Sequence, residues 1–184
     1  MMKRALTAAT VAILGFGVTA SMAQPKAPRV VPYKFFDDAY RAGGFDYAYG
    51  GKSKGITITK DGGYKSKAAL NIKLDPSEYS GASVCLYNET FDLNKFMLDS
   101  RIEFMIKGKK GGEQLKVGLL DEEVTDGKKT QVVLPMNKYI EGGTVTTDWK
   151  KVSIPLVDFP DRGLYWDNTR KSEFPSRIDW DKIA

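Results

Sequence analysis

Hydrophobic and polar residues alternate along much of the chain with a period of two, the pattern of strands that bury one face. In Arg101–Lys107, isoleucine or phenylalanine occupies every second position, and Gln114–Leu120 alternates leucine or valine with lysine or glycine. Apolar runs of this kind recur at intervals of roughly ten to fifteen residues, as in all-β sandwiches. We predict strands near Tyr33–Tyr40, Gly55–Thr59, Ala68–Leu74, Ser83–Tyr87, Arg101–Lys107, Gln114–Leu120, Thr130–Leu134 and Lys151–Leu156.

Glycine-rich turns separate these runs. They lie at Asp61–Gly63, Gly108–Gly112, Asp126–Gly127 and Glu141–Gly143, and Asp126–Gly127 is suited to closing a hairpin. No long segment has the 3.6-residue period of a helix, although Leu93–Leu98 allows one helical turn. The pattern therefore predicts an all-β fold, an antiparallel β-sandwich of jelly-roll type.

The first 23 residues have the pattern of a secretory signal peptide. Lys3 and Arg4 precede an apolar stretch, and small residues occupy Ser21–Ala23. The apolar stretch is shorter than the ~20 residues that span a bilayer. We predict a signal peptide at 1–23, an extended proline-rich leader at 24–32 and one domain at 33–184, in a protein secreted to the periplasm or the extracellular space.

Composition excludes several functions. Removal of the signal peptide leaves 26 basic and 23 acidic residues, a net charge of +3, and the lysines are scattered. A nucleic-acid site would concentrate them in one stripe. The chain has no histidine, which excludes Ser-His-Asp or Cys-His catalysis and histidine-ligated zinc. Cys85 is the only cysteine and lies in an apolar run, so we predict a buried thiol and no disulfide.

Four segments resemble one family. They are Phe35–Tyr40, Glu78–Val84, Phe91–Phe104 and the strand Thr147–Phe159 with its final Asp-Phe. In their order and spacing they are similar to non-catalytic carbohydrate-binding modules with a galactose-binding-like jelly-roll, especially those of family 11. The resemblance implies that a β-glucan-type chain binds to a concave sheet face, by stacking on aromatic rings and by hydrogen bonds to polar side chains.

The strongest candidate site implied by the resemblance is Arg162, Tyr165 and Trp166, in the segment Pro160–Asn168 that we predict to be a loop. The alternative is that one ring caps the core while Arg162 pairs with an acid. Weaker candidates for carbohydrate contact are Tyr49, Tyr79 and Tyr87.

The sequence also gives expectations for Tyr47, Tyr49 and Trp149. Tyr47 and Tyr49 are expected to share one face of an alternating, glycine-flanked segment. We assign Trp149 to the structure, because it precedes a strand with apolar inward positions.

The resemblance also implies structural calcium, for which Asp37 and Asp38 are candidate ligands. Neighbouring residues on a strand point to opposite faces, so only one of them would serve there.

Other functions remain open from the sequence. The domain would be a structural or adhesive β-sandwich without a sugar site, or, less favoured, a two-carboxylate glycoside hydrolase. As a binding module it would take a polysaccharide as ligand and accompany a catalytic domain in a longer chain or complex. The ending at Arg177–Ala184 resembles the approach to a further strand, so we expect that strand to be missing and the sequence to be part of a longer protein.

Overall fold

The computed structural model describes residues 33–50, 55–75, 80–86, 90–122 and 128–184. The chain divides into two units, Met1–Tyr33 and Lys34–Ala184, and the second contains all the described strands. The predicted signal peptide and leader lie outside the described residues and stay predictions. Within the described part of the chain, no helix is long and apolar enough to cross a membrane.

The second unit is built from strands joined by turns and short 3₁₀ helices, and its described residues include no α-helix. The strands are β1 (Gly44–Gly50), β2 (Gly55–Lys60), β3 (Ala68–Lys73), β4 (Ser80–Leu86), β5 (Arg101–Ile106), β6 (Lys116–Leu120), β7 (Thr130–Pro135), β8 (Lys150–Pro155), β9 (Arg162–Asp167) and β10 (Ser172–Arg177). The 3₁₀ helices are η1 (Asn94–Phe96), η2 (Met136–Lys138) and η3 (Leu156–Asp158).

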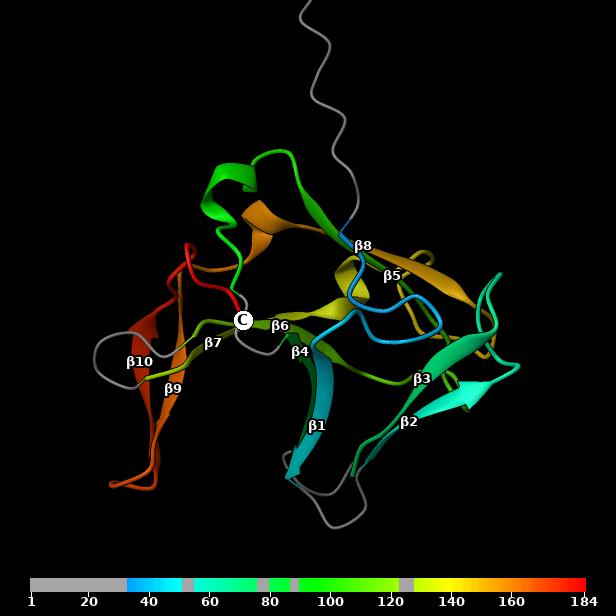
Figure 1. Ribbon diagram of the computed structural model, residues 1–184, viewed down its shortest axis with the longest axis horizontal. Coiled ribbons are helices and arrows are strands. Elements are labelled where there is room, and N and C mark those ends of the chain that lie inside the picture. Colours follow the sequence, from blue (N-terminus) through cyan, green and yellow to red (C-terminus); the bar gives the residue numbers. More distant parts are fainter. Residues whose placement is uncertain (1–32, 51–54, 76–79, 87–89, 123–127) are drawn as a thin grey trace, which may run out of the picture. The chain divides into compact units, whose positions relative to one another are not determined.

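All of the strand pairings are antiparallel. A four-stranded sheet has the order β10-β9-β7-β6, and three two-stranded sheets pair β1 with β4, β2 with β3, and β5 with β8 (Figure 1). The predicted all-β antiparallel sandwich is confirmed. The turn expected at Asp126–Gly127 lies outside the described residues, although the strands on either side of it, β6 and β7, do pair as a hairpin would.

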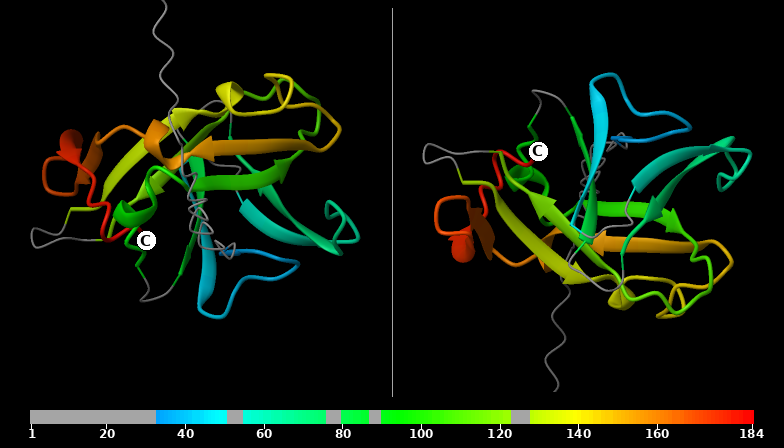
Figure 2. Two further views of the ribbon diagram at one scale, coloured as in Figure 1. Left: turned by 90° about the horizontal axis from the view of Figure 1, so that it is seen from above. Right: turned by 90° about the horizontal axis from the view of Figure 1, so that it is seen from below.

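The hydrophobic core lies between the β5–β8 sheet and the β6–β7 part of the larger sheet. Val152 and Ile154 of β8 are fully buried, as is Val132 of β7. Half-buried side chains of β5 and β6 pack against the same cluster. Figure 2 shows from above and below that β5 and β8 run side by side, as their register requires. Alternation predicted this core correctly because each of these strands has one apolar face.

A buried carboxylate ties the end of the chain to the larger sheet. Asp121 accepts hydrogen bonds from the backbone N–H of Thr130 at 2.5 Å and of Asp179 at 2.9 Å. Ile183 is buried and forms isolated bridges with both Phe91 and Asp121. These contacts place the last residues against β6 and the segment before η1.

The sequence predictions were wrong at three places in the secondary structure. Tyr33–Tyr40 is not a strand: Phe36 and Tyr40 bridge across a tight turn in which Asp38 has a φ of 63°. β10 was not expected as a strand, whereas for Gly44–Gly50, which forms β1, the alternation left strand or loop open. The predicted loop Pro160–Asn168 contains β9, which pairs with β7 on one side and β10 on the other.

Candidate functional site

β1 carries three aromatic side chains on one of its faces. Phe45, Tyr47 and Tyr49 occupy alternate positions, so they point to the same side of the strand. Phe45 and Tyr47 are each 41% exposed, and the ring centroids of Tyr47 and Tyr49 lie 5.9 Å apart. We call these three residues the β1 aromatic stripe.

The strand beside the stripe offers small residues at the matching positions. Phe45 lies opposite Cys85, Tyr47 opposite Ser83 and Tyr49 opposite Gly81. A Cβ atom at Gly81 would overlap the ring of Tyr49, so this ring lies across β4 in space that only glycine leaves open. Because directly opposite residues share a face, the stripe is bordered by small β4 residues, of which Gly81 and Ser83 are half-buried and Cys85 is buried.

The reverse face of β1 is held by a different contact. Asp46 accepts a short hydrogen bond from the hydroxyl of Tyr40. Burial, followed by this hydrogen bond, raises the pKa of Tyr40, which therefore stays protonated as the donor at neutral pH. The contact joins β1 to the preceding turn and leaves the aromatic face uninvolved.

The structure separates the three residues of the strongest predicted site. Arg162, Leu164 and Trp166 lie on one face of β9, whereas Tyr165 lies on the other. Tyr165 is half-buried, packs against Phe174 at 5.8 Å between ring centroids and has the ammonium of Lys128 above it. The prediction that Arg162, Tyr165 and Trp166 converge in a loop was wrong, because neighbouring residues on a strand point in opposite directions.

Trp166 is the more accessible of the two neighbouring rings, with 54% of its surface exposed. Two further candidates, Tyr79 and Tyr87, lie outside the described residues. Tyr49 is thus the predicted binding tyrosine for which the structure shows an aromatic neighbour on the same strand face.

Asp37 and Asp38 each have a protein partner. Asp37 pairs with Lys34 at 2.5 Å, and Asp38 accepts a hydrogen bond of 2.7 Å from the backbone N–H of Ala68. This hydrogen bond is the main cause of the lowered pKa of Asp38. No group of three or more acidic, cysteine or histidine side chains in the described segments is placed to hold a metal ion, so these two carboxylates show no metal-binding arrangement. Calcium stays a prediction.

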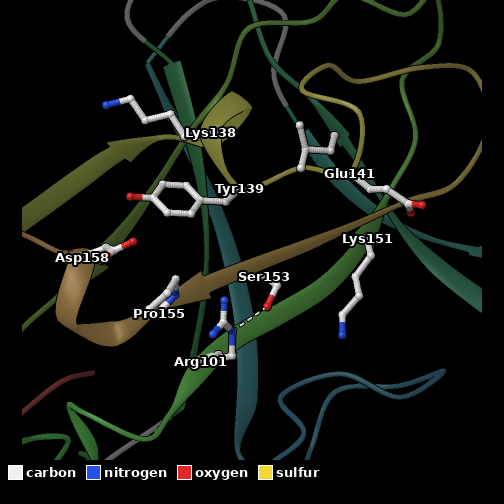
Figure 3. A pocket seen from close by; sticks show the side chains of 9 residues that line it. Arg101, Lys138, Tyr139, Glu141, Lys151, Ser153, Pro155 and Asp158 are labelled. Carbon is white, nitrogen blue, oxygen red and sulfur yellow. Dashed lines mark hydrogen bonds between the residues drawn. The ribbon is translucent and has the colours of Figure 1, made fainter.

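An open pocket of about 640 Å³ lies on the outward face of β5 and β8, beside η2 (Figure 3). Arg101 Nε donates a hydrogen bond to Ser153 Oγ, and that hydroxyl donates to Glu103 Oε1, both at 2.8 Å. Lys151 pairs with the same carboxylate at 2.8 Å and is the first cause of its lowered pKa. Glu103 is therefore an ionised group held by its neighbours.

The sequence did not indicate two other aromatic contacts. Tyr64 lies 6.2 Å from Trp149 between ring centroids, and the ammonium of Lys107 lies 4.9 Å from the Trp149 ring. Phe45 was not considered as part of a site, although the spacing of aromatic residues in Gly44–Gly50 contained the signal.

The strands and their pairings define a class, that of antiparallel β-sandwich domains. A sequence model described as carbohydrate binding domain 30 matches residues 32–183. The chain therefore belongs to the carbohydrate-binding domain 30 family, a family of carbohydrate-binding modules.

Structural comparison agrees with this assignment. A solved structure described as a family 30 carbohydrate binding module matches with a TM-score of 0.53 and 24% identity, over 74% of this chain and 85% of the other. At this identity the likeness concerns the fold. No curated protein sequence matches the chain. The expected carbohydrate-binding class is confirmed, but the family is 30, not the family 11 suggested by the sequence.

Proposed function

We propose that the domain binds a neutral β-glucan-type polysaccharide along the β1 aromatic stripe and does not alter it chemically. The observation that carries the proposal is the placement of Phe45, Tyr47 and Tyr49 on one accessible face of β1. Pyranose rings present apolar C–H faces that stack on aromatic rings. Rings at every second position of a strand repeat at roughly 7 Å, which suits an extended chain of sugars.

Polar groups at the stripe can satisfy the sugar hydroxyls. The hydroxyls of Tyr47 and Tyr49 and that of Ser83, opposite Tyr47, each act as donor and acceptor. A site made of a few stacked rings and exposed hydroxyls predicts micromolar binding, roughly −7 to −8 kcal/mol in total.

Membership of the carbohydrate-binding domain 30 family supports a non-catalytic module. Hydrolysis by two carboxylates needs one of them protonated as a general acid, which requires a raised pKa. Glu103 beside the open pocket has a lowered pKa, because Lys151 and Ser153 stabilise its charge, so this carboxylate does not suit the role of general acid. The proposed module is secreted by the predicted signal peptide and works beside catalytic domains.

Isothermal titration calorimetry of the domain tests the proposal against mixed-linkage β-glucan, xyloglucan, cellulose oligosaccharides, xylan and mannan. The Y47A/Y49A variant should bind the glucan about tenfold more weakly or worse. F96A is the matched control, since Phe96 is a 49% exposed ring on η1, outside the stripe. Unchanged glucan binding by folded Y47A/Y49A, or no binding by the parent domain across the panel, would contradict the proposal.

A further inference from the structure

A second surface lies on the outward face of β9 and β10, away from the core. It consists of Arg162, Leu164 and Trp166 of β9 with Pro175 and Arg177 of β10, and we call it the β9–β10 outer face. Every one of these side chains is exposed, whereas the intervening residues, such as Tyr165 and Phe174, are half-buried on the other face. Neither β1 nor β4 contributes to it.

One end of this face is apolar and flat. Trp166 is 54% exposed and Leu164 is 44% exposed, although both belong to the central strand of three paired strands. Pro175 lies directly opposite Leu164 and extends the apolar surface onto β10. An exposed indole beside small apolar groups is a platform on which a sugar ring can stack.

The other end carries two opposed positive charges. Arg162 and Arg177 are directly opposite each other in the β9–β10 register. Like charges at such positions destabilise a sheet. Within the described part of the chain, neither guanidinium forms an ion pair, whereas Arg170 of the nearby turn pairs with Asp167. An anion that lay between or above the two guanidiniums would relieve this repulsion.

One acidic side chain, that of Glu173, borders this face at the end away from the arginines. Glu173 is opposite Trp166, at the other end of the paired strands from Arg177. Its carboxylate can accept hydrogen bonds from sugar hydroxyls beside the indole. Trp166 is four positions along the strand from Arg162, a distance of roughly 13 Å. One short stretch of polysaccharide can therefore reach both ends.

We propose that the β9–β10 outer face binds an anionic polysaccharide whose sugars carry carboxylates. The two guanidiniums would hold a carboxylate through charge-assisted hydrogen bonds, a geometry that arginine forms well. Trp166 and Leu164 would contact the apolar face of a neighbouring sugar. A neutral glucan offers the arginine pair hydroxyl acceptors but no negative charge, so this site differs in ligand from the β1 aromatic stripe and does not depend on it.

The chemical test uses one sugar backbone in two charge states. Polygalacturonate should bind the domain at low salt, and highly methyl-esterified polygalacturonate, which keeps the rings but loses the charges, should bind at least fivefold more weakly. Added salt should weaken binding to the charged polymer because exposed ionic contacts are screened. Equal binding of both forms, or no binding of the charged form by the folded domain, would overturn the proposal.

Substitutions locate the site. R162Q/R177Q should bind polygalacturonate roughly five- to thirtyfold more weakly, the loss expected for two exposed ionic contacts. The matched control is K109Q/K110Q, which removes the same charge from two exposed lysines between β5 and β6. If both variants lose affinity equally, the attraction is a general charge effect and the specific site is wrong.

Two further measurements distinguish ligand binding at the β9–β10 outer face from a purely structural role of its arginines and from ligand binding at the β1 aromatic stripe. Without ligand, R162Q should slightly raise the free energy of unfolding, because it removes a like-charge contact. R162Q/R177Q should still bind neutral glucan like the parent, and Y47A/Y49A should still bind polygalacturonate. A loss of polygalacturonate binding in Y47A/Y49A would place the anionic ligand on the stripe and contradict the proposal.

Discussion

Gly81 determines how the ring of Tyr49 can lie. Glycine within a strand often marks a close approach of another group, and here the group is the phenol ring of the opposite residue. The sequence showed an aromatic residue and a glycine in separate segments but not their register. The pairing of β1 with β4 was therefore needed to relate them.

We predict that Gly81→Ala displaces the Tyr49 ring and weakens glucan binding roughly two- to tenfold, the loss expected from one impaired stacking contact. Calorimetry would measure the effect. Gly55→Ala on β2 is the matched control, because an added Cβ there meets no other atom within 4 Å and the residue lies outside the stripe. Equal affinity in parent and Gly81→Ala would mean that the Tyr49 ring does not contact the sugar.

Asp121 is a buried carboxylate whose pKa should influence stability. Burial is the main cause that raises its pKa above the ordinary value of 3.8, and the hydrogen bonds from the N–H groups of Asp179 and Thr130 partly oppose it. The folded protein thus holds this proton more tightly than the unfolded chain. The resulting contribution to stability is largest below the unfolded pKa and is lost as pH rises through the folded pKa.

We therefore predict that the free energy of unfolding of the parent, relative to Asp121→Asn, falls as the pH rises from below 3.8 and levels off above the folded pKa. Urea unfolding at a series of pH values gives this difference, and the other carboxylates cancel because both proteins contain them. A difference that increases with pH would show that the pKa of Asp121 is lowered in the folded state.

Among the secondary-structure elements, β9 is a strand that the sequence pattern predicted to be a loop. Pro160–Asn168 was predicted to be a loop because it has no hydrophobic period. In the structure, Gly163 permits a close approach of strands: a Cβ there would overlap the backbone carbonyl of Gln131 on β7. By contrast, the strands β5 and β8 were predicted correctly, because each has a buried apolar face. β9 lacks that signal, since its outward positions include Leu164 and Trp166.

Because Trp166 points outward from β9, its fluorescence should be accessible to a quencher in solution. Trp166 is 54% exposed, whereas Trp180 is 8% exposed and donates a hydrogen bond of 3.2 Å to Asp161 Oδ1. We predict that Trp166→Phe removes most of the tryptophan fluorescence that acrylamide quenches. Trp180→Phe is the comparison and should leave that quenchable part intact. If Trp166→Phe does not change quenching, the outward orientation of Trp166 is wrong.

At the scale of the whole molecule, burial is unevenly distributed along the chain. Of the buried hydrophobic side chains in the described residues, Ala68 and Cys85 precede β5, and the others lie between Val132 and Ile183. The sheets β1–β4 and β2–β3 therefore have fewer fully buried contacts than the β5–β8 and β6–β7 layers. Local stability follows the density of such contacts.

We predict that backbone amides of β7 and β8 exchange with deuterium far more slowly than those of β1 and β2. Hydrogen exchange followed by mass spectrometry measures this on the intact domain. Saturating glucan should slow exchange in β1 and β4 if the ligand lies on the stripe. Exchange in β1 as slow as in β8 without ligand would contradict the uneven distribution of stability.

The carbohydrate-binding class and the fold class could be predicted from the sequence, whereas the particular family and the arrangement of the site could not. Period-two alternation and turn glycines determine an antiparallel sandwich, and ordered short motifs pointed to carbohydrate-binding modules. Which rings share a face depends on strand boundaries and register. They place Tyr165 and Arg162 on opposite faces of β9, and they add Phe45 to the pair Tyr47 and Tyr49, whose shared face the alternation predicted.

The most direct test of the central claim is an NMR titration of tyrosine ring signals with a β-glucan oligosaccharide. If the β1 aromatic stripe binds the glucan, the ring protons of Tyr47 and Tyr49 should show saturable shifts, and those of Tyr139 beside the open pocket should not shift. Saturable binding that leaves the Tyr47 and Tyr49 signals unchanged would contradict the account and place the sugar elsewhere on the domain.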